Sequence, residues 1–384
     1  MASRHAAELP SRDALLRAPS IVQHGSVSAP VDAALAAVRA VAAAARGTDR
    51  RLAAVDDADT LIDLIASHAR ITLNFHPDRL LPDGRSVAES LAADGIYRSQ
   101  YETGVTAGSR SAFLGGERDT WERGLFGDHH HATVTPADRP KYGAFNLAHV
   151  PDGAAPRFGS AHVRLRPAVS RRATFTVGDS HLGPVDIGTI DEFRMVLGGF
   201  LHRPTADGTE IAALRALADA DRRPPADNGR QLDDYIEAQV HGVVDLGTDA
   251  EAVVLDPSFR GTEVERLFVE LTGGLGIGLD WHAGYGLRAD AVTDHFRGPE
   301  IPPFARAVGD RFGGGWLDAR IIGLAAAETV REPGAWARLG GPDDLLQHLK
   351  RVWHTVVAFG VPSDGAMIDE HSDRVASTPT YPRS

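Results

Sequence analysis

Apolar side chains recur at helical spacing over residues 31–47 and again over residues 57–70. The first segment is rich in alanine, which favours helices, and it ends at Gly47, a residue type that commonly follows the last turn of a helix. Both segments are therefore predicted to be helices that pack through one apolar face. Residues 1–30, which precede them, show no periodicity and are expected to form a flexible leader.

The period of the pattern changes after the second helix. Residues 71–76 alternate apolar and polar side chains, which predicts a half-buried strand with His76 on its polar face. A short helix is predicted farther on, because Ser86 and Glu89 have the spacing of a capping box. Gly95 stands where that helix would end.

The middle of the chain is rich in predicted strands. Residues 161–167 and 173–177 alternate in the same way, and the short segment between them suits a hairpin or a tight crossover. Residues 235–246 and 250–259 form another pair, and the sequence GTD that separates them is a hairpin signal. Beyond residue 260 the helical period returns, with glycine and proline between the segments.

These patterns predict an α+β protein with N-terminal helices, a strand-rich central domain and a helical C-terminal region. The last residues are polar and without pattern, so we expect a flexible tail. The predicted divisions are 1–30, 31–70, 71–260, 261–360 and 361–384.

Composition narrows the possible functions. The formal charge of −12 disfavours a broad surface for nucleic acid or anionic membranes. The absence of cysteine excludes disulfides and cysteine ligands, and it suits the reducing cytoplasm, where we expect the protein. No apolar run approaches the roughly 20 residues that span a bilayer, so no membrane association is expected. The consecutive histidines 129–131, in a predicted loop, make a poor metal site, and no metal is expected.

Two later strands present polar side chains on one face. Alternation places Glu237, Gln239 and His241 together, and it places Tyr142 on an open face beside Gly143, which permits close backbone approach. A histidine, a tyrosine and a glutamate on neighbouring strands could hold a nucleotide sugar, with the phenol ring stacked on a flat heterocycle. A carboxylate bonded to a ribose 2′-hydroxyl supports an oxocarbenium-like transition state at the adjoining anomeric carbon.

The order of these segments resembles the ADP-ribosyltransferase fold of the His-Tyr-Glu type. The likeness consists of the strand ending in histidine, the capped helix closing in DGI, and then SQYETGVTAGS, KYGAF and YIEAQ, over residues 71–260. The resemblance implies a split antiparallel sheet that binds NAD as a substrate. The chain also resembles a bacterial domain family of unknown function, through TLNFHPDR, KYGAFNL and VLDPSFRGT.

The resemblance also implies roles for individual residues. His76 would bind the ribose on the adenosine side, Tyr142 would stack on nicotinamide, and Glu237 would be the catalytic carboxylate. Gln239 and Ser109 would assist.

Other interpretations of these residues stay open. Arg79 could open the triad in place of His76, as an arginine does in toxin-type transferases, although alternation favours His76. The family usually has a glycine after the histidine, whereas Pro77 has no N–H to offer the nicotinamide amide. Glu237 could instead be an exposed, salt-bridged strand residue. His282 could line the same cleft or belong to a buried cluster with Tyr285.

The implied activity is mono-ADP-ribosylation. The enzyme would cleave NAD at the nicotinamide glycosidic bond and pass ADP-ribose to an unknown protein, nucleic acid or small molecule. The alternatives are an NAD glycohydrolase, an RNA 2′-phosphotransferase, or a module that binds NAD or ADP-ribose without turnover. The acidic balance of the chain counts against the phosphotransferase.

Overall fold

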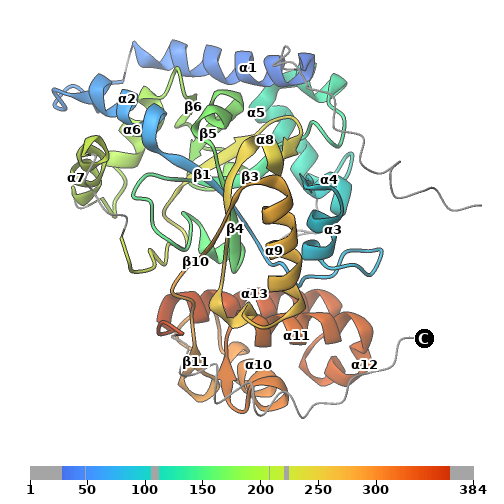
Figure 1. Ribbon diagram of the computed structural model, residues 1–384. Helices are drawn as coiled ribbons and strands as arrows, with labels where there is room; N and C mark the ends of the chain where they lie inside the picture. The colour runs from blue at the N-terminus through green and yellow to red at the C-terminus, as the bar shows by residue number, and fades with distance from the viewer. Residues whose placement is uncertain (1–27, 48, 105–111, 207, 220–224, 364–384) are drawn as a thin grey trace, which may run out of the picture.

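The computed structural model describes residues 28–47, 49–104, 112–206, 208–219 and 225–363 (Figure 1). It confirms the α+β class, with N-terminal helices, a mixed and mostly antiparallel sheet, and a helical C-terminal region. In Figure 1 the sheet occupies the middle of the molecule, helix α1 lies across one end, and the C-terminal helices lie at the other. None of the described helices has the length and apolar composition to cross a membrane.

The central sheet has eight strands in the order β10-β9-β4-β1-β3-β7-β5-β6. All neighbours in it are antiparallel except β9 and β10. The strands are β1 (Arg70–Phe75), β3 (Lys141–Asn146), β4 (Ala161–Leu165), β5 (Ala173–Val177), β6 (Ile187–Thr189), β7 (Ile236–Val240), β9 (Ala250–Leu255) and β10 (Gly278–Trp281). Short pairs are formed by β2 (Ile96–Tyr97) with β8 (Val244–Asp245) and by β11 (Leu287–Arg288) with β12 (Trp316–Leu317).

One face of the sheet carries the main hydrophobic core. Alternation in β1 sends Ile71, Leu73 and Phe75 into it, where they meet Phe145 and other apolar side chains of the neighbouring strands. Helices cover this face: α2 (Ala58–His68), α3 (Val87–Asp94), α6 (Arg194–Leu201), α7 (Thr209–Arg215) and α9 (Glu263–Leu275). The opposite face carries polar side chains of β1, β3 and β7, some of which line the candidate site.

The N-terminal helices and the capped helix form as predicted. Helix α1 (Ala29–Arg46) packs against α5 (Glu117–Thr133), and α4 (Gln100–Thr103) is a single turn. Helix α3 begins with a complete capping box, in which the Ser86 hydroxyl accepts from the Glu89 N–H at 3.1 Å and the Glu89 carboxylate accepts from the Ser86 N–H at 2.7 Å. Gly95 ends α3 in the left-handed conformation, at φ 70°.

The C-terminal helices enclose a second hydrophobic core. They are α10 (Ile301–Val308), α11 (Ala319–Arg331), α12 (Pro333–Trp336) and α13 (Pro342–Phe359). Trp353 and Val356 of α13 lie fully inside this core. The central sheet itself continues past residue 260, because α9 leads into β10. The glycine-rich stretch that follows Leu271 therefore ends a helix and begins a strand.

Two local predictions are wrong, and a third holds in one of its two alternatives. Strands β4 and β5 do not pair, and a 3₁₀ helix over Pro167–Arg172 joins them, so their connection is the short crossover and not the hairpin. Strands β7 and β9 are also apart, and the GTD sequence lies in the helical turn α8 (Leu246–Asp249). The consecutive histidines lie on α5 instead of in a loop. Alternation specifies which face of a strand is buried, but it leaves the partner strand open.

Candidate functional site

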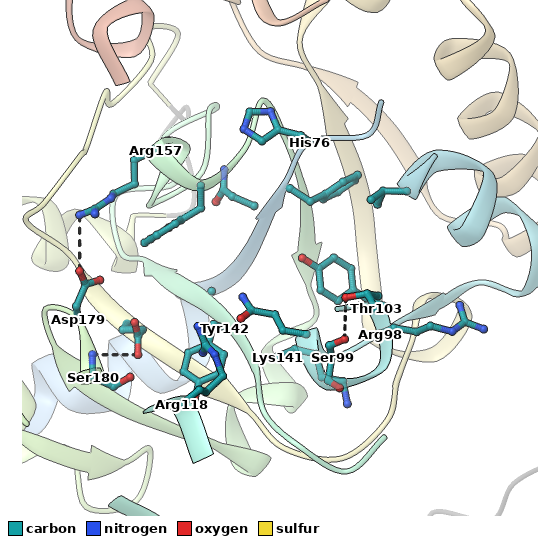
Figure 2. A pocket seen from close by; sticks show the side chains of 18 of the residues that line it. His76, Arg98, Ser99, Thr103, Arg118, Lys141, Tyr142, Arg157, Asp179 and Ser180 are labelled. Carbon is teal, nitrogen blue, oxygen red and sulfur yellow. Dashed lines mark hydrogen bonds and ion pairs between the residues drawn. The ribbon is translucent and has the colours of Figure 1, made fainter. Parts of the chain in front are cut away.

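A cavity of about 690 Å³ lies at the end of β1 and beside β3 and β7, and side chains from both faces of the sheet line it (Figure 2). It is lined by His76, Tyr142 and Glu237, which follow or lie on the neighbouring strands β1, β3 and β7. The register places Tyr142 opposite Gln239 and Ala144 opposite Glu237, so these side chains project from the same face of the sheet. The structure therefore brings the predicted triad to one cavity.

Glu237 is a buried carboxylate, with 6% of its surface exposed. Its Oε1 atom accepts hydrogen bonds from the Ser180 N–H at 3.3 Å and from the Gln239 amide at 2.8 Å. Burial raises the pKa of the Glu237 carboxyl to about 7. Within the described residues, Glu237 forms no ion pair and its Oε2 atom receives no hydrogen bond. The exposed, salt-bridged interpretation of this residue is thus wrong.

Gln239 lies two residues after Glu237 on β7, on the same face of the sheet, and does not line the cavity. Its Oε1 atom accepts from the Thr174 hydroxyl at 2.7 Å, and its Nε2 donates to Thr176 at 3.1 Å as well as to Glu237. These bonds fix which end of the amide is the donor, and so the orientation of Gln239 holds the Glu237 carboxylate in place.

Tyr142 is held by charged neighbours that the sequence did not reveal. Its hydroxyl donates to Glu122 Oε1 at 2.7 Å, and burial together with that carboxylate raises the Tyr142 pKa well above its ordinary value. Glu122 also accepts from Arg139 at 2.7 Å. The guanidinium of Arg118 lies 4.5 Å from the centre of the Tyr142 ring and covers one face of the tyrosine (Figure 2). The same guanidinium lies 4.6 Å from the ring centre of Trp121.

His76 lies across the cavity from Tyr142 and Arg118 (Figure 2). Its Nδ1 atom is 3.5 Å from the Ser160 hydroxyl, and its ring meets the edge of Trp353 from α13 at a centroid distance of 5.4 Å. Burial, and secondarily the charge of Arg79, lower the His76 pKa to about 3. The imidazole is therefore neutral at physiological pH and can both donate and accept a hydrogen bond.

Basic side chains line the same end of the cavity as His76. They include Arg79, which the sequence suggested, and Arg157 and Lys350, which it did not. Arg157 forms ion pairs with Asp179, at 3.8 Å, and with Asp233. No pattern in the sequence indicated Lys350, because α13 is remote in the chain from the three strands.

Of the two remaining predicted site residues, Ser109 lies outside the described residues. His282 is 5% exposed and does not line the cavity; its Nε2 atom contacts the Ser160 carbonyl at 3.0 Å and its ring lies 5.7 Å from that of Tyr285. The buried-cluster interpretation of His282 holds. Among the described residues, no group of three or more histidine or acidic side chains is arranged to hold a metal ion.

A family model described as "Protein of unknown function (DUF3626)" matches residues 70–359. The match begins at the first residue of β1 and ends at the last residue of α13, so it includes the whole sheet and the C-terminal helices. The chain therefore belongs to this family. No curated protein matches the chain.

Proposed function

We propose that this member of the DUF3626 family cleaves NAD at its nicotinamide glycosidic bond and transfers ADP-ribose to an acceptor. One observation carries the proposal: His76, Tyr142 and Glu237, from consecutive neighbours in the sheet, line a single cavity. Their order along the chain is that of the His-Tyr-Glu ADP-ribosyltransferases, which the sequence resembles. The cavity volume lies within the usual range for small-molecule sites.

Glu237 would stabilise the transition state. Its Oε2 atom, which receives no hydrogen bond from the described residues, would accept one from the ribose 2′-hydroxyl next to the breaking bond. A negative charge there stabilises the oxocarbenium ion as the bond to nicotinamide lengthens. Nicotinamide leaves with the electron pair of that bond and becomes neutral. The acceptor then bonds to the anomeric carbon and releases a proton, and with water as the acceptor the product is free ADP-ribose.

Tyr142 and Arg118 would act on the leaving group. The pyridine ring would take the face of Tyr142 opposite Arg118, or replace Arg118 on its own face. In either position a guanidinium lies near a ring that is cationic before cleavage and neutral after it. Arg118 forms no ion pair with a described residue, and its buried Nε atom has no hydrogen-bond partner there. Its charge therefore disfavours bound NAD more than released nicotinamide.

Pro77 remains a departure from the family pattern. Its carbonyl accepts from the Ala88 N–H at 2.8 Å, and it has no N–H of its own. Recognition of the nicotinamide amide must therefore use another group in the cavity. His76 itself would bind the adenosine-side ribose as a neutral donor and acceptor.

The test is to incubate the protein with NAD labelled in its adenosine half, and to measure released nicotinamide and label transferred to candidate acceptors. Glu237→Gln should reduce nicotinamide release by roughly 10²- to 10³-fold, the usual effect of removing one electrostatic stabiliser. Glu270→Gln, an exposed change on α9, is the matched control. Unchanged release by Glu237→Gln would remove this residue from the mechanism. Saturable NAD binding without nicotinamide formation would identify a binding module instead.

A further inference from the structure

A second, smaller cavity of about 30 Å³ lies beyond His76. His76, Arg79, Arg157 and Lys350 line both cavities, so these side chains form the boundary between them. The remaining walls of the small cavity come from Asp78 and from α11 and α13 of the C-terminal region. The C-terminal helices thus close one end of the candidate active site.

The side chains at this boundary are mostly cationic, and two of the three cations have no carboxylate partner in the described part of the chain. Among the described residues, Arg79 and Lys350 form no ion pair, and their side-chain nitrogens donate to no protein acceptor. Burial lowers the pKa of Lys350, the charge of Arg157 lowers it further, and the charge of Asp179 opposes them. Asp78, in the wall of the small cavity, lies near enough for its charge to act on Arg79, but burial raises the pKa of Asp78 to about 7.

Uncompensated cations in a partly buried site are costly unless an anion joins them. In the described part of the chain Arg157 is paired with Asp179 and Asp233, which both line the large cavity, so the cations at the boundary without a carboxylate partner are Arg79 and Lys350. A phosphate group fits such a set of donors, because guanidinium and ammonium groups are the side chains that proteins use to bind it.

We propose that Arg79, Arg157 and Lys350 form a phosphate subsite, with Lys350 supplied by the C-terminal helical region, that holds a phosphate of the dinucleotide substrate. The position of the nucleotide rests on the proposed function, which places His76 at the adenosine-side ribose. Two phosphates adjoin that ribose: the 5′-diphosphate, present in NAD and NADP alike, and the 2′-phosphate, present in NADP alone. Both give the same chemistry at the subsite, and binding measurements separate them.

The experiment is calorimetric titration of the full chain with pyrophosphate, NAD and NADP at one low ionic strength. Lys350→Gln should weaken pyrophosphate binding roughly ten- to hundredfold, since it removes a charge-assisted hydrogen bond. Lys350→Arg should retain most of the affinity. Arg306→Gln, an exposed change on α10 that removes the same charge outside both cavities, should bind as the native protein does. Arg79→Gln is an independent second variant.

The result also assigns the phosphate. Equal affinities for NAD and NADP that fall together in Lys350→Gln place the diphosphate at the subsite. Tighter binding of NADP, lost in Lys350→Gln, places the 2′-phosphate there. Lys350→Gln and Arg79→Gln proteins that are folded, by thermal unfolding, and bind all three ligands like the native protein would overturn the proposal.

Binding is measured without turnover, so the two proposals can fail separately. Titrations are repeated in Glu237→Gln, which keeps the cationic residues. If phosphate binding depends on Lys350 but the native protein forms no nicotinamide, the proposed function is rejected and the subsite is kept. Nicotinamide release that depends on Glu237, with ligand binding indifferent to Arg79 and Lys350, would do the reverse.

Discussion

Replacing Glu237 by glutamine is expected to stabilise the protein at pH 8. Burial raises the pKa of this carboxyl from an ordinary 4.5 to about 7, so the folded protein holds the proton more tightly than the unfolded chain. The corresponding stability is fully present below pH 4.5 and is lost as the pH rises through about 7. Since each pKa unit corresponds to roughly 1.4 kcal/mol, the ionised carboxylate costs about 3 kcal/mol at pH 8.

The assay is urea unfolding of the native protein, Glu237→Gln and the control Glu270→Gln, each at pH 5 and pH 8. Glutamine has nearly the same shape and carries no charge, so the variant should be more stable than the native protein by on the order of 2 to 3 kcal/mol at pH 8 and by less than about 1 kcal/mol at pH 5. Burial also raises the pKa values of Asp78 and Asp318. Their effects are common to every variant and cancel in the difference.

A stability difference that does not change between pH 5 and pH 8 would refute the reasoning. A variant less stable than the native protein at pH 8 would refute it more strongly, because it would mean that the ionised Glu237 gains more from its neighbours than it loses by burial. Its hydrogen bonds from Ser180 and Gln239 would then outweigh desolvation, against the net shift in pKa.

Two further changes test how the site is built. Gly143→Ala should destabilise the fold by roughly 1 to 3 kcal/mol, because the new methyl carbon would lie 2.4 Å from the Thr72 carbonyl oxygen. The control Gly124→Ala has open space on α5 and should be neutral or stabilising. Equal urea midpoints for the two variants would contradict this prediction. Tyr142→Phe should lower the free energy of unfolding by about 1 to 3 kcal/mol, because buried Glu122 loses a hydrogen-bond donor. NAD affinity should persist because the aromatic ring remains, and calorimetry showing lost binding would contradict the stacking role.

Alternation along the strands predicted much of the candidate site. It placed Ile71, Leu73 and Phe75 in the core and aimed His76 the other way, and the register of β3 and β7 brings Tyr142 and Glu237 to the same face. These outcomes depend only on which side of a strand is buried, and a period of two residues records that directly. The capping box at Ser86 was equally local and equally visible.

Features that depend on contacts remote in the chain were not predicted. The pairing of β4 with β9, and of β5 with β7, joins segments that no turn signal connects. Arg118 and Glu122 lie on α5, where a weakly amphipathic stretch gives no indication that it faces a strand. Lys350 is one charge among several on α13, and only the position of this helix in the folded protein shows that Lys350 reaches a cavity. The sequence also could not decide between the cavity and the buried cluster for His282, because its contact with the Ser160 carbonyl joins segments remote in the chain.

The cost of Glu237 bears on the function as well as on the fold. A carboxylate on a solvated strand would titrate normally, and one in an inert core would be replaced by an apolar side chain at a gain in stability. Glu237 is buried, held at Oε1 by Ser180 and Gln239, and directed at a cavity. Gln239 is itself held by Thr174, so further hydrogen bonds in the sheet orient the Glu237 carboxylate, although this carboxylate lowers the stability of the fold. Such an arrangement is typical of a group kept for its reactivity, because a charge poorly solvated in the empty site interacts strongly with a cation that forms there.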